Sequence, residues 1–443
     1  MRGYEEHKKG LGEIMSFLTG PMRKHVNGHK GLTDHSEIKF VDPGELVYLP
    51  LINMGSTAYE VLVKEGDSVK VGTKVAFRND HFTVHLYSSV SGTVKGVQKI
   101  MHASLRPIDH LVIVNDGKYE KEAPIKPIDY KSASKEELVE FMKNMGLVGC
   151  GGAGFPTYIK YRGVQGIKKL IINAVECEPY ITVDYAGMKE NLEDLVAGVD
   201  ALLKTCEAEK AMVCIKETKK DFIPVLKDAF KDFENIEVVP VPDVYPMGWE
   251  RTLVYEVTKQ RYEKLPSEIG CIVNNAATAI AFARCMRTGM PIVEKLVTVS
   301  GDGVAEPCNV RVPVGTPAGV IINQCGGYTA EDILLIAGGP MMGKTITSDK
   351  FVIGTYSNAL TVLQHKPVKA IACLRCGKCS DHCPAGLQPV RINAAEKAKD
   401  TDALKKLGVM DCVECGMCTY ICPSKIDVTE GVRRAKRIMA LKK

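Results

Sequence analysis

Residues 373–384 read C-L-R-C-G-K-C-S-D-H-C-P, and residues 412–423 repeat the pattern as C-V-E-C-G-M-C-T-Y-I-C-P. In each run, three cysteines are spaced three residues apart, and a fourth follows four residues later, directly before a proline. Three thiolates at this spacing can surround an iron–sulfur cube from a single tight loop. The pattern therefore predicts a C-terminal domain, residues 360–443, that is organised by metal clusters.

The fourth cysteine of each run lies too far along the chain to complete the cube of its own run, so we expect it to ligate the other cube. The proline that follows ends the loop. The two predicted [4Fe–4S] ligand sets are Cys373, Cys376, Cys379 and Cys422, and Cys412, Cys415, Cys418 and Cys383. Zinc is the alternative metal, but a zinc site usually combines two C-x-x-C hooks in one tetrahedron, which needs fewer cysteines than these runs supply. His382 is expected to pack at the surface and face solvent.

The composition suits a globular protein that lies in the cytoplasm and does not bind nucleic acid. The net charge of the 443 residues is +5, with no basic stripe. No apolar run is long enough to cross a bilayer, and residues 1–20 lack the apolar core of a secretory signal. Disulfides are rare in the cytosol, so clustered cysteines indicate metal. We expect the eight cysteines outside the two runs to be mostly buried small hydrophobes.

Hydrophobic periodicity predicts an α/β multidomain protein. Residues 1–40 are polar and weakly patterned, which favours an N-terminal leader or a segment that wraps over the surface. Residues 41–125 contain short strands separated by glycines and predict a small β module. Strands and helices alternate over residues 126–290, which indicates a sheet flanked by helices. Residues 291–350 are β-rich again.

Two of these modules resemble known folds. The strings V-K-E-G-D-S-V-K-V-G (residues 63–72) and S-S-V-S-G-T-V (residues 88–94) resemble the barrel-sandwich hybrid fold of biotinyl and lipoyl carriers. No lysine stands between methionines as in the biotin attachment site, so a structural module without a prosthetic group is expected. The section 291–350 resembles the soluble-ligand-binding β-grasp (SLBB) module.

A glycine-rich stretch, G-L-V-G-C-G-G-A-G-F-P-T at residues 146–157, is the second chemical signal. Such glycine density exposes backbone N–H groups and lets a phosphate or a flavin approach closely. The stretch follows a predicted helix and precedes a predicted strand, which is not the strand–loop–helix context of a Rossmann fingerprint, and the lysine-serine pair of a P-loop is absent. Taken alone, a loop of this kind is often only a turn.

The string G-G-A-G-F-P-T-x-x-K resembles the NADH- and FMN-binding loop of the complex I flavoprotein. The wider order of motifs resembles the RnfC family, the C component of the Rnf electron-transport complex. N-A-V-E-C-E-P-Y (residues 173–180), Y-P-M-G-W-E (residues 245–250) and V-N-N-A-A-T (residues 273–278) follow in that family's order, before the two cysteine runs. The resemblance spans Val61 to Pro423.

This resemblance implies a domain at residues 126–290 that binds FMN and NAD(H) and passes electrons to two [4Fe–4S] clusters. It implies a flavin and nicotinamide pocket lined by the glycine-rich loop, a lysine that neutralises the flavin phosphate, and polar residues around the ribityl chain and the nucleotide ribose. The residues implied are Gly149, Gly151, Gly152, Gly154, Phe155, Lys160, Asn173, Glu176, Glu178, Tyr245, Gly248, Glu250, Asn274, Asn275 and Thr278. Without the resemblance, Asn274 and Asn275 would be helix caps, and Glu176 and Glu178 would belong to a solvated turn.

Some family features are missing. Trp249, the single tryptophan of the chain, replaces the second glycine of the family's Y-P-x-G-G-E turn, where it would narrow the nucleotide pocket or stack on adenine. The family's N-terminal G-G-x-H and Q-H-I-G-A-P elements are also absent. The function implied is that of an NADH dehydrogenase-type oxidoreductase, either a peripheral component on the cytoplasmic membrane that works with Rnf membrane subunits and ferredoxin, or a soluble relative that reduces a corrinoid enzyme or a proline reductase. The alternative from another class is a non-enzymatic electron-wiring module.

Overall fold

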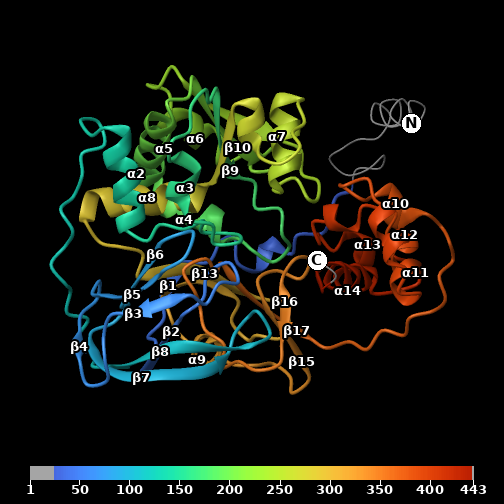
Figure 1. Ribbon diagram of the computed structural model, residues 1–443, viewed down its shortest axis with the longest axis horizontal. Coiled ribbons are helices and arrows are strands. Elements are labelled where there is room, and N and C mark those ends of the chain that lie inside the picture. Colours follow the sequence, from blue (N-terminus) through green and yellow to red (C-terminus); the bar gives the residue numbers. More distant parts are fainter. Residues whose placement is uncertain (1–23, 442–443) are drawn as a thin grey trace.

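The computed structural model describes residues 24–441 and forms a mixed α/β protein with four regions (Figure 1). None of the helices in the described range is both long and apolar enough to span a bilayer. Residues 135–288 form an α/β domain, two β-rich modules lie together on one side of it, and the cysteine domain forms a separate lobe.

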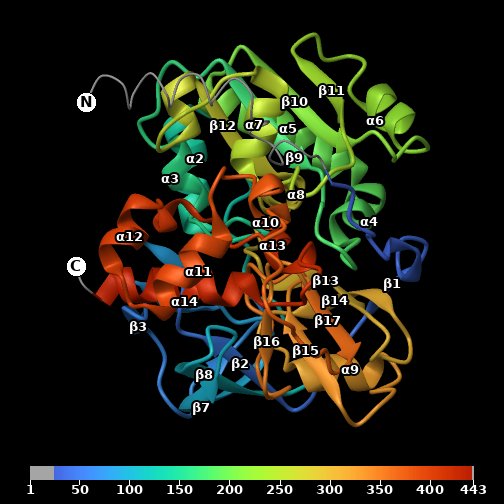
Figure 2. The same ribbon diagram turned by 90° about the vertical axis from the view of Figure 1, so that its right-hand side faces the viewer.

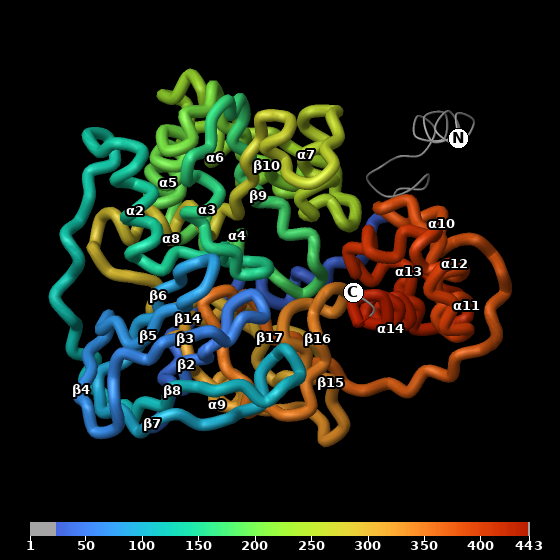
Figure 3. The backbone as a smooth tube through the Cα atoms, in the orientation of Figure 1, coloured from blue at the N-terminus to red at the C-terminus, as the bar shows by residue number. Residues whose placement is uncertain are grey.

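The first β module consists of two small sheets that face each other across a shared apolar core, which includes Val47, Leu49 and Ile113. The strand orders are β2-β8-β7-β4 and β3-β5-β6. β7 and β8 form a long antiparallel hairpin that extends toward β16 (Figure 3). The strands are β2 (Leu46–Pro50), β3 (Tyr59–Val61), β4 (Ser68–Val69), β5 (Lys74–Arg78), β6 (Val84–Tyr87), β7 (Gly92–Met101) and β8 (Pro107–Asn115).

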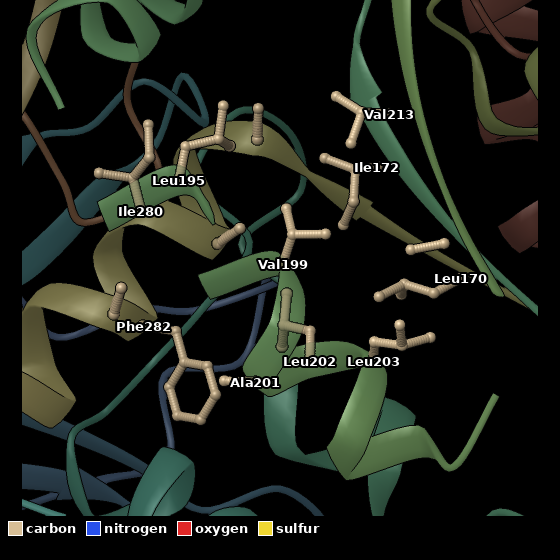
Figure 4. Close-up of a cluster of buried hydrophobic side chains, with 14 of the residues drawn as sticks. Leu170, Ile172, Leu195, Val199, Ala201, Leu202, Leu203, Val213, Ile280 and Phe282 are labelled. Carbon is tan, nitrogen blue, oxygen red and sulfur yellow. The ribbon is translucent and has the colours of Figure 1, made fainter. Parts of the chain in front are cut away.

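The α/β domain is built on a parallel four-stranded sheet of order β11-β10-β9-β12. Its strands are continuous apolar runs, as expected when both faces of a parallel sheet are covered. On one face Leu170 and Ile172 pack against Val199 and Leu202 of α5 (Figure 4), while Ile171 packs on the other face with Leu253 of α7. The strands are β9 (Lys169–Ala174), β10 (Lys210–Lys216), β11 (Ile236–Val241) and β12 (Cys271–Asn275).

The helices of this domain begin and end near the functional motifs. The short helix α3 stands between the glycine-rich loop and β9, where the sequence predicted that a strand would follow the loop directly. The helices are α2 (Lys135–Asn144), α3 (Thr157–Tyr161), α4 (Val183–Glu190), α5 (Leu192–Cys206), α6 (Ile223–Ala229), α7 (Glu250–Thr258) and α8 (Ala276–Thr288), with η2 (Pro266–Ile269).

The second β module is a six-stranded sheet of order β1-β14-β13-β17-β15-β16. β1 belongs to the segment that the sequence predicted as a leader, and it pairs in parallel with β14. Residues 24–40 therefore belong to the folded body, which fits the surface-wrap alternative for them and not a separate leader; residues 1–23 of that segment lie outside the described range. The elements are η1 (Lys30–Leu32), β1 (Ile38–Phe40), β13 (Glu294–Ser300), β14 (Cys308–Pro313), α9 (Ala318–Gln324), β15 (Ile333–Ala337), β16 (Lys344–Ile346) and β17 (Ala359–Gln364).

The cysteine domain lies against the junction between the α/β domain and the β modules (Figure 2). Each cysteine run leads into a short helix, α10 or α13, and longer helices pack around a small core that contains Ile392, Leu404 and Val432. The elements are α10 (Lys378–Asp381), α11 (Pro389–Lys397), α12 (Thr401–Lys406), η3 (Val409–Asp411), α13 (Met417–Tyr420) and α14 (Val428–Leu441).

Candidate functional site

A cavity of about 740 Å³ lies where β9 and β12 end, bordered by Asn173 and Asn275. Ligands of open parallel sheets bind at this carboxyl edge, and the volume is in the range of cofactor pockets. The second β module supplies parts of the segments 337–344 and 351–359 to the wall, and the tip of the β7–β8 hairpin supplies His102, Ala103, Ser104 and Arg106. Three regions of the chain therefore enclose one cavity.

The structure brings eight of the fifteen predicted flavin and nucleotide residues to the cavity wall. These eight residues are Gly151, Gly152, Asn173, Glu176, Glu178, Gly248, Glu250 and Asn275. Trp249 also lines the cavity and leaves it open. The seven predicted residues behind the wall are Gly149, Gly154, Phe155, Lys160, Tyr245, Asn274 and Thr278.

Several of the seven residues behind the wall shape the glycine-rich loop. The N–H of Gly149 donates to the Phe155 carbonyl at 2.9 Å, and the Thr278 hydroxyl accepts from the Cys150 N–H at 3.0 Å. Gly154 has φ +67°, and a Cβ there would lie 2.9 Å from the Tyr356 ring, so glycine is required. These contacts present Gly151 and Gly152 to the cavity.

Two predicted polar residues are occupied by protein partners. The Lys160 ammonium donates to the Val273 carbonyl at 2.7 Å, and burial lowers its pKa. The side-chain amide of Asn274 donates to the Tyr161 hydroxyl at 2.8 Å. Asn275 caps α8 by accepting the Ala277 N–H, as the simpler interpretation of its sequence predicted, and it also borders the cavity.

The side chain of Glu176 is largely covered at the cavity wall, with 8% of it exposed, and does not lie in a solvated turn. One carboxylate oxygen accepts the Asp184 N–H at 2.7 Å, and the other lies 3.6 Å from the Lys30 ammonium. Burial raises the pKa of the Glu176 carboxyl to about 7, although Lys30 opposes the shift. A group with this pKa changes its protonation state near neutral pH.

Lys30 is a site residue that the sequence did not indicate. Its ammonium donates to the carbonyls of Glu176 and Glu178 at 2.9 Å and to the carbonyl of Ile181. Burial lowers the pKa of Lys30, against the attraction of Glu176. A lysine from the N-terminal segment thus holds the E-C-E-P turn in place.

Glu178 joins the cavity to the cysteine domain. One carboxylate oxygen accepts the N–H groups of Met341 at 2.6 Å and Met342 at 3.0 Å, while the Tyr245 hydroxyl lies 3.4 Å from the other oxygen. Tyr245 also donates to the Cys415 carbonyl at 2.6 Å. The cavity wall and the loop of the second cysteine run therefore share a continuous hydrogen-bonded boundary.

The cavity chemistry fits a flavin. Asp184 accepts the Asn275 amide on one carboxylate oxygen at 2.9 Å, but its Oδ1 is buried without a partner among the described residues. This acceptor can take a ring N–H of a ligand. A Cβ on Gly152 would meet nothing within 4 Å, so the backbone is open to a planar ring system. Asp184, which the sequence did not indicate, is thus a further candidate ligand contact.

The cysteine domain gathers one of the predicted crossed ligand sets around a small hollow. Its lining includes Cys383 of the first run and Cys412, Cys415 and Cys418 of the second. Burial raises the pKa of all four thiols, and that of Cys418 reaches about 12. Four buried thiols that face a common space fit a cluster that would stabilise them as thiolates.

The second predicted set is nearer the surface. Cys373 and Cys376 are exposed, whereas Cys379 and Cys422 are half-buried. Ser424, just beyond Cys422, accepts the Ile371 N–H on its backbone carbonyl at 3.1 Å and donates its hydroxyl to the Ala372 carbonyl at 3.0 Å. The chain ahead of Cys373 is therefore held beside the end of the second run.

Three further observations concern single-metal sites, His382 and the cysteines outside the two runs. Across residues 24–441, no three His, Cys, Asp or Glu side chains meet closely enough to hold a single metal ion. The prediction that His382 faces solvent was wrong: the residue is buried, and its ring is 2.9 Å from the Lys378 carbonyl. Outside the two runs, seven of the eight cysteines are buried, and Cys177 is half-buried, as expected.

Models of known protein families match most of the chain. Four family models match: the RnfC barrel sandwich hybrid domain over residues 22–118, the Nuo51 FMN-binding domain over residues 142–284, the SLBB domain over residues 296–345, and a 4Fe-4S dicluster domain over residues 366–423. These matches confirm the predicted fold class and the presence of FMN-binding and iron–sulfur domains.

Curated relatives match over nearly the whole chain, and each is the C component of a multi-subunit oxidoreductase. The one from the Na(+)-translocating ferredoxin:NAD(+) oxidoreductase complex of Acetobacterium woodii is 34% identical over 93% of this chain and 95% of its own length. The one from the ion-translocating oxidoreductase complex of Rhodobacter capsulatus is 34% identical over 87% of this chain and 76% of its own. The one from the proton-translocating ferredoxin:NAD(+) oxidoreductase complex of Clostridium ljungdahlii is 32% identical, covering 83% and 82%.

A solved structure shares the fold at low sequence identity. The NAD+-reducing [NiFe]-hydrogenase in its H2-reduced state aligns with a TM-score of 0.50 and 18% identity, over 71% of this chain and 62% of that chain. The likeness concerns the fold alone.

Proposed function

Since the chain belongs to the RnfC family, whose members are components of ion-translocating oxidoreductase complexes, we propose that it transfers electrons between NADH and two [4Fe–4S] clusters through FMN. The observation that carries the proposal is the shared boundary between the cavity and the cysteine lobe. Met342 lines the cavity, and the backbone of the preceding residue, Met341, touches the loop at Gly416, where an added Cβ would lie 2.5 Å from the Met341 oxygen.

FMN is proposed to lie deep in the cavity, against the glycine-rich loop. Bound there, it would supply the conversion of two-electron exchange with a nicotinamide into one-electron exchange with iron–sulfur clusters. Gly151 and Gly152 offer close backbone approach, and Asp184 offers a buried acceptor. Asn173 and Asn275 offer polar contacts at the strand ends.

Charged side chains of the protein lie beside the proposed flavin site. Lys30 and Glu176 form a buried pair beside the cavity, and the Glu176 carboxyl, whose pKa is raised to about 7 by burial, can hold or release a proton at neutral pH. Two backbone N–H groups donate hydrogen bonds to the Glu178 carboxylate, which lies at the boundary between the cavity and the cysteine lobe. No side chain is assigned as a general base.

Two clusters with crossed ligands are proposed for the cysteine lobe. Cys383, Cys412, Cys415 and Cys418 would hold the cluster that faces the cavity, because the Cys415 carbonyl is bonded to Tyr245. Cys373, Cys376, Cys379 and Cys422 would hold the outer cluster, whose first two ligands are exposed. Electrons would then pass between the cavity and the surface through the buried cluster.

The names of the relatives bear on where the chain works. We propose that it is a peripheral component on the cytoplasmic face of the membrane, and that its partners are the other Rnf subunits, with ferredoxin at the far end of the electron path. The relatives are named as parts of ferredoxin:NAD(+) oxidoreductase complexes, which supports this placement.

The direct test is NADH-dependent reduction of a viologen dye by protein purified without oxygen. The proposal predicts a colour change of the dye that requires both the flavin and the clusters. Absence of NADH oxidation with the iron–sulfur clusters intact would favour the alternative of a non-enzymatic wiring module, in which Trp249 closes the nucleotide site. The cavity remains open beside Trp249, which supports the enzymatic function over the wiring module.

A further inference from the structure

The charges around the cavity are unevenly distributed. The α/β domain contributes the carboxylates Glu176, Glu178, Asp184 and Glu250 to the wall, but no arginine or lysine from this domain lines the cavity. Among the described residues, the Arg and Lys side chains that line it are Arg106, on the β7–β8 hairpin, and Lys344, at the start of β16. The positive charge that could neutralise a phosphate bound in the cavity therefore comes from these two lining side chains.

Neither cation is neutralised by the rest of the described chain. Arg106 and Lys344 have no hydrogen-bond or ion-pair partner for their side chains within residues 24–441, and both are exposed at the rim. Both side chains line the same cavity, together with His102 of the hairpin. An anion bound in this cavity would be attracted by both cations.

The hairpin tip that carries Arg106 is rigidly built. The His102 N–H donates to the Arg106 carbonyl at 3.0 Å, and the Leu105 N–H donates to the His102 carbonyl at 2.9 Å. The His102 ring accepts the Ser104 N–H on Nδ1 at 3.0 Å, so its proton is on Nε2 and donates to the Tyr356 hydroxyl at 3.0 Å. The tip is thus fixed to the second β module, and the backbone at Arg106 is held beside the cavity.

We propose that Arg106 and Lys344 bind the pyrophosphate of the dinucleotide, so that the two β modules complete a nucleotide site that the α/β domain leaves without cations. The inference rests on the proposed function and identifies where the dinucleotide lies. An arginine fork can take two phosphate oxygens at once, and a lysine adds a point charge. The sequence-based candidate, Lys160, is engaged with the Val273 carbonyl and does not line the cavity.

The position of the two cations favours the pyrophosphate of the dinucleotide, and not the flavin phosphate, as the group that they bind. Both cations are exposed at the rim, where an exchangeable substrate enters, whereas Asn275 and Asp184 mark the deep wall. Ser104 and Lys344 also border a neighbouring hollow of about 540 Å³ on the side of α14, so the rim has room for the rest of a long ligand. A flavin held at the deep wall would leave the rim to the pyrophosphate.

The test uses ADP-ribose, which carries the pyrophosphate but no nicotinamide, and measures its dissociation constant with the full-length flavin- and cluster-loaded protein. Trp249, the single tryptophan of the chain, lines the cavity and gives a fluorescence signal, and calorimetry provides a second one. Arg106→Gln and Lys344→Gln are each expected to weaken ADP-ribose binding about tenfold. The double variant should also show a smaller dependence of affinity on salt.

Lys350→Gln is the matched control, because Lys350 is an exposed lysine of the same β module that does not line the cavity. Its affinity for ADP-ribose should equal that of the wild type. Unchanged affinity in both rim variants, or no binding of ADP-ribose by the wild type, would overturn the inference. Loss of FMN from the rim variants with unchanged ADP-ribose affinity would also overturn it, by assigning the cations to the flavin phosphate.

These outcomes are separable from failure of the proposed function. If the wild type reduces viologen with NADH and the rim variants bind ADP-ribose normally, the function stands and the inference falls. If the wild type binds ADP-ribose through Arg106 and Lys344 but does not oxidise NADH, the site assignment stands and the electron-transfer function falls.

Discussion

The hydroxyl group of Tyr245 donates a 2.6 Å hydrogen bond to the backbone carbonyl of Cys415, and so links the turn beside the cavity to a predicted cluster ligand. Both residues are buried, so the bond lies in a region of low dielectric constant, where an unsatisfied carbonyl is costly. The contact makes the orientation of the cysteine lobe depend on the α/β domain.

Tyr245→Phe removes this bond and leaves the Cys415 carbonyl without its donor. We expect the free energy of unfolding to fall by about 1–3 kcal/mol, with flavin and iron contents unchanged, and we expect cluster reduction by NADH to slow relative to flavin reduction in stopped-flow absorbance. Tyr48→Phe is the control, since the Tyr48 hydroxyl has no hydrogen-bond partner among the described residues. Equal behaviour of the two variants would show that the bond has no part in coupling the lobes.

Gly416→Ala tests the packing of the buried cysteine loop on the cavity wall. Gly416 has φ +78°, and a Cβ there would lie 2.5 Å from the Met341 oxygen. Gly377 occupies the same position in the first run with φ +77°, but a Cβ there would meet only Asp381, at 3.8 Å.

Both alanine variants carry the strain of a left-handed backbone, about 1–2 kcal/mol. Only Gly416→Ala also forces the loop away from Met341, so it should lower the thermal midpoint further and slow NADH-dependent cluster reduction. Identical midpoints and rates for Gly377→Ala and Gly416→Ala would contradict the contact.

Crossed ligation predicts which cysteine pairs act together. Cys383→Ser should impair the cluster of the second run, so Cys383→Ser combined with Cys412→Ala should lose no more iron than either change alone, about four atoms of eight. Cys383→Ser combined with Cys373→Ala should lose both clusters. Iron and sulfide analysis with electron paramagnetic resonance of the reduced protein distinguishes the two pairs, and the reverse pattern would establish ligation within each run.

Glu176 predicts a pH-dependent stability. Because burial raises the pKa of its carboxyl to about 7, the folded protein holds a proton that the unfolded chain releases near its ordinary value. The unfolded state then binds fewer protons between about pH 5 and pH 7, and stability falls as pH rises through this window.

Glu176→Gln removes that titration. The thermal midpoint of the wild type minus that of the variant should therefore decrease from pH 5.5 to pH 7.5, because only the wild type loses a proton at position 176 over this range. A difference that stays constant, or grows with pH, would show that Lys30 keeps the carboxylate ionised throughout.

The cysteine domain was the most predictable part of the fold, because the spacing of a metal-binding loop is encoded within about ten residues. The same holds for the glycine-rich loop, whose residues Gly151 and Gly152 line the cavity. A sheet flanked by helices was also expected, since short apolar strands such as Leu170-Ile171-Ile172 alternate with helical patterns.

The cations at the site were not predictable, because each comes from a region without a chemical motif. Lys30 comes from a segment with little hydrophobic pattern, and Arg106 and Lys344 come from two β modules whose packing against the α/β domain is non-local. Conversely, the family resemblance implied that Lys160 neutralises the flavin phosphate, yet its ammonium, on α3, donates to the Val273 carbonyl. Asp184 was missed because α4 presents it across the sheet edge to Asn275.

The most direct measurement of electron transfer through this chain is an anaerobic titration of the purified protein with NADH, followed by flavin absorbance and by electron paramagnetic resonance of the clusters. We expect about eight irons and one flavin per chain, and reduction of the flavin and both clusters by NADH without any other protein. Zinc in place of iron, about four irons instead of eight, or clusters that dithionite reduces and NADH does not, would contradict this expectation.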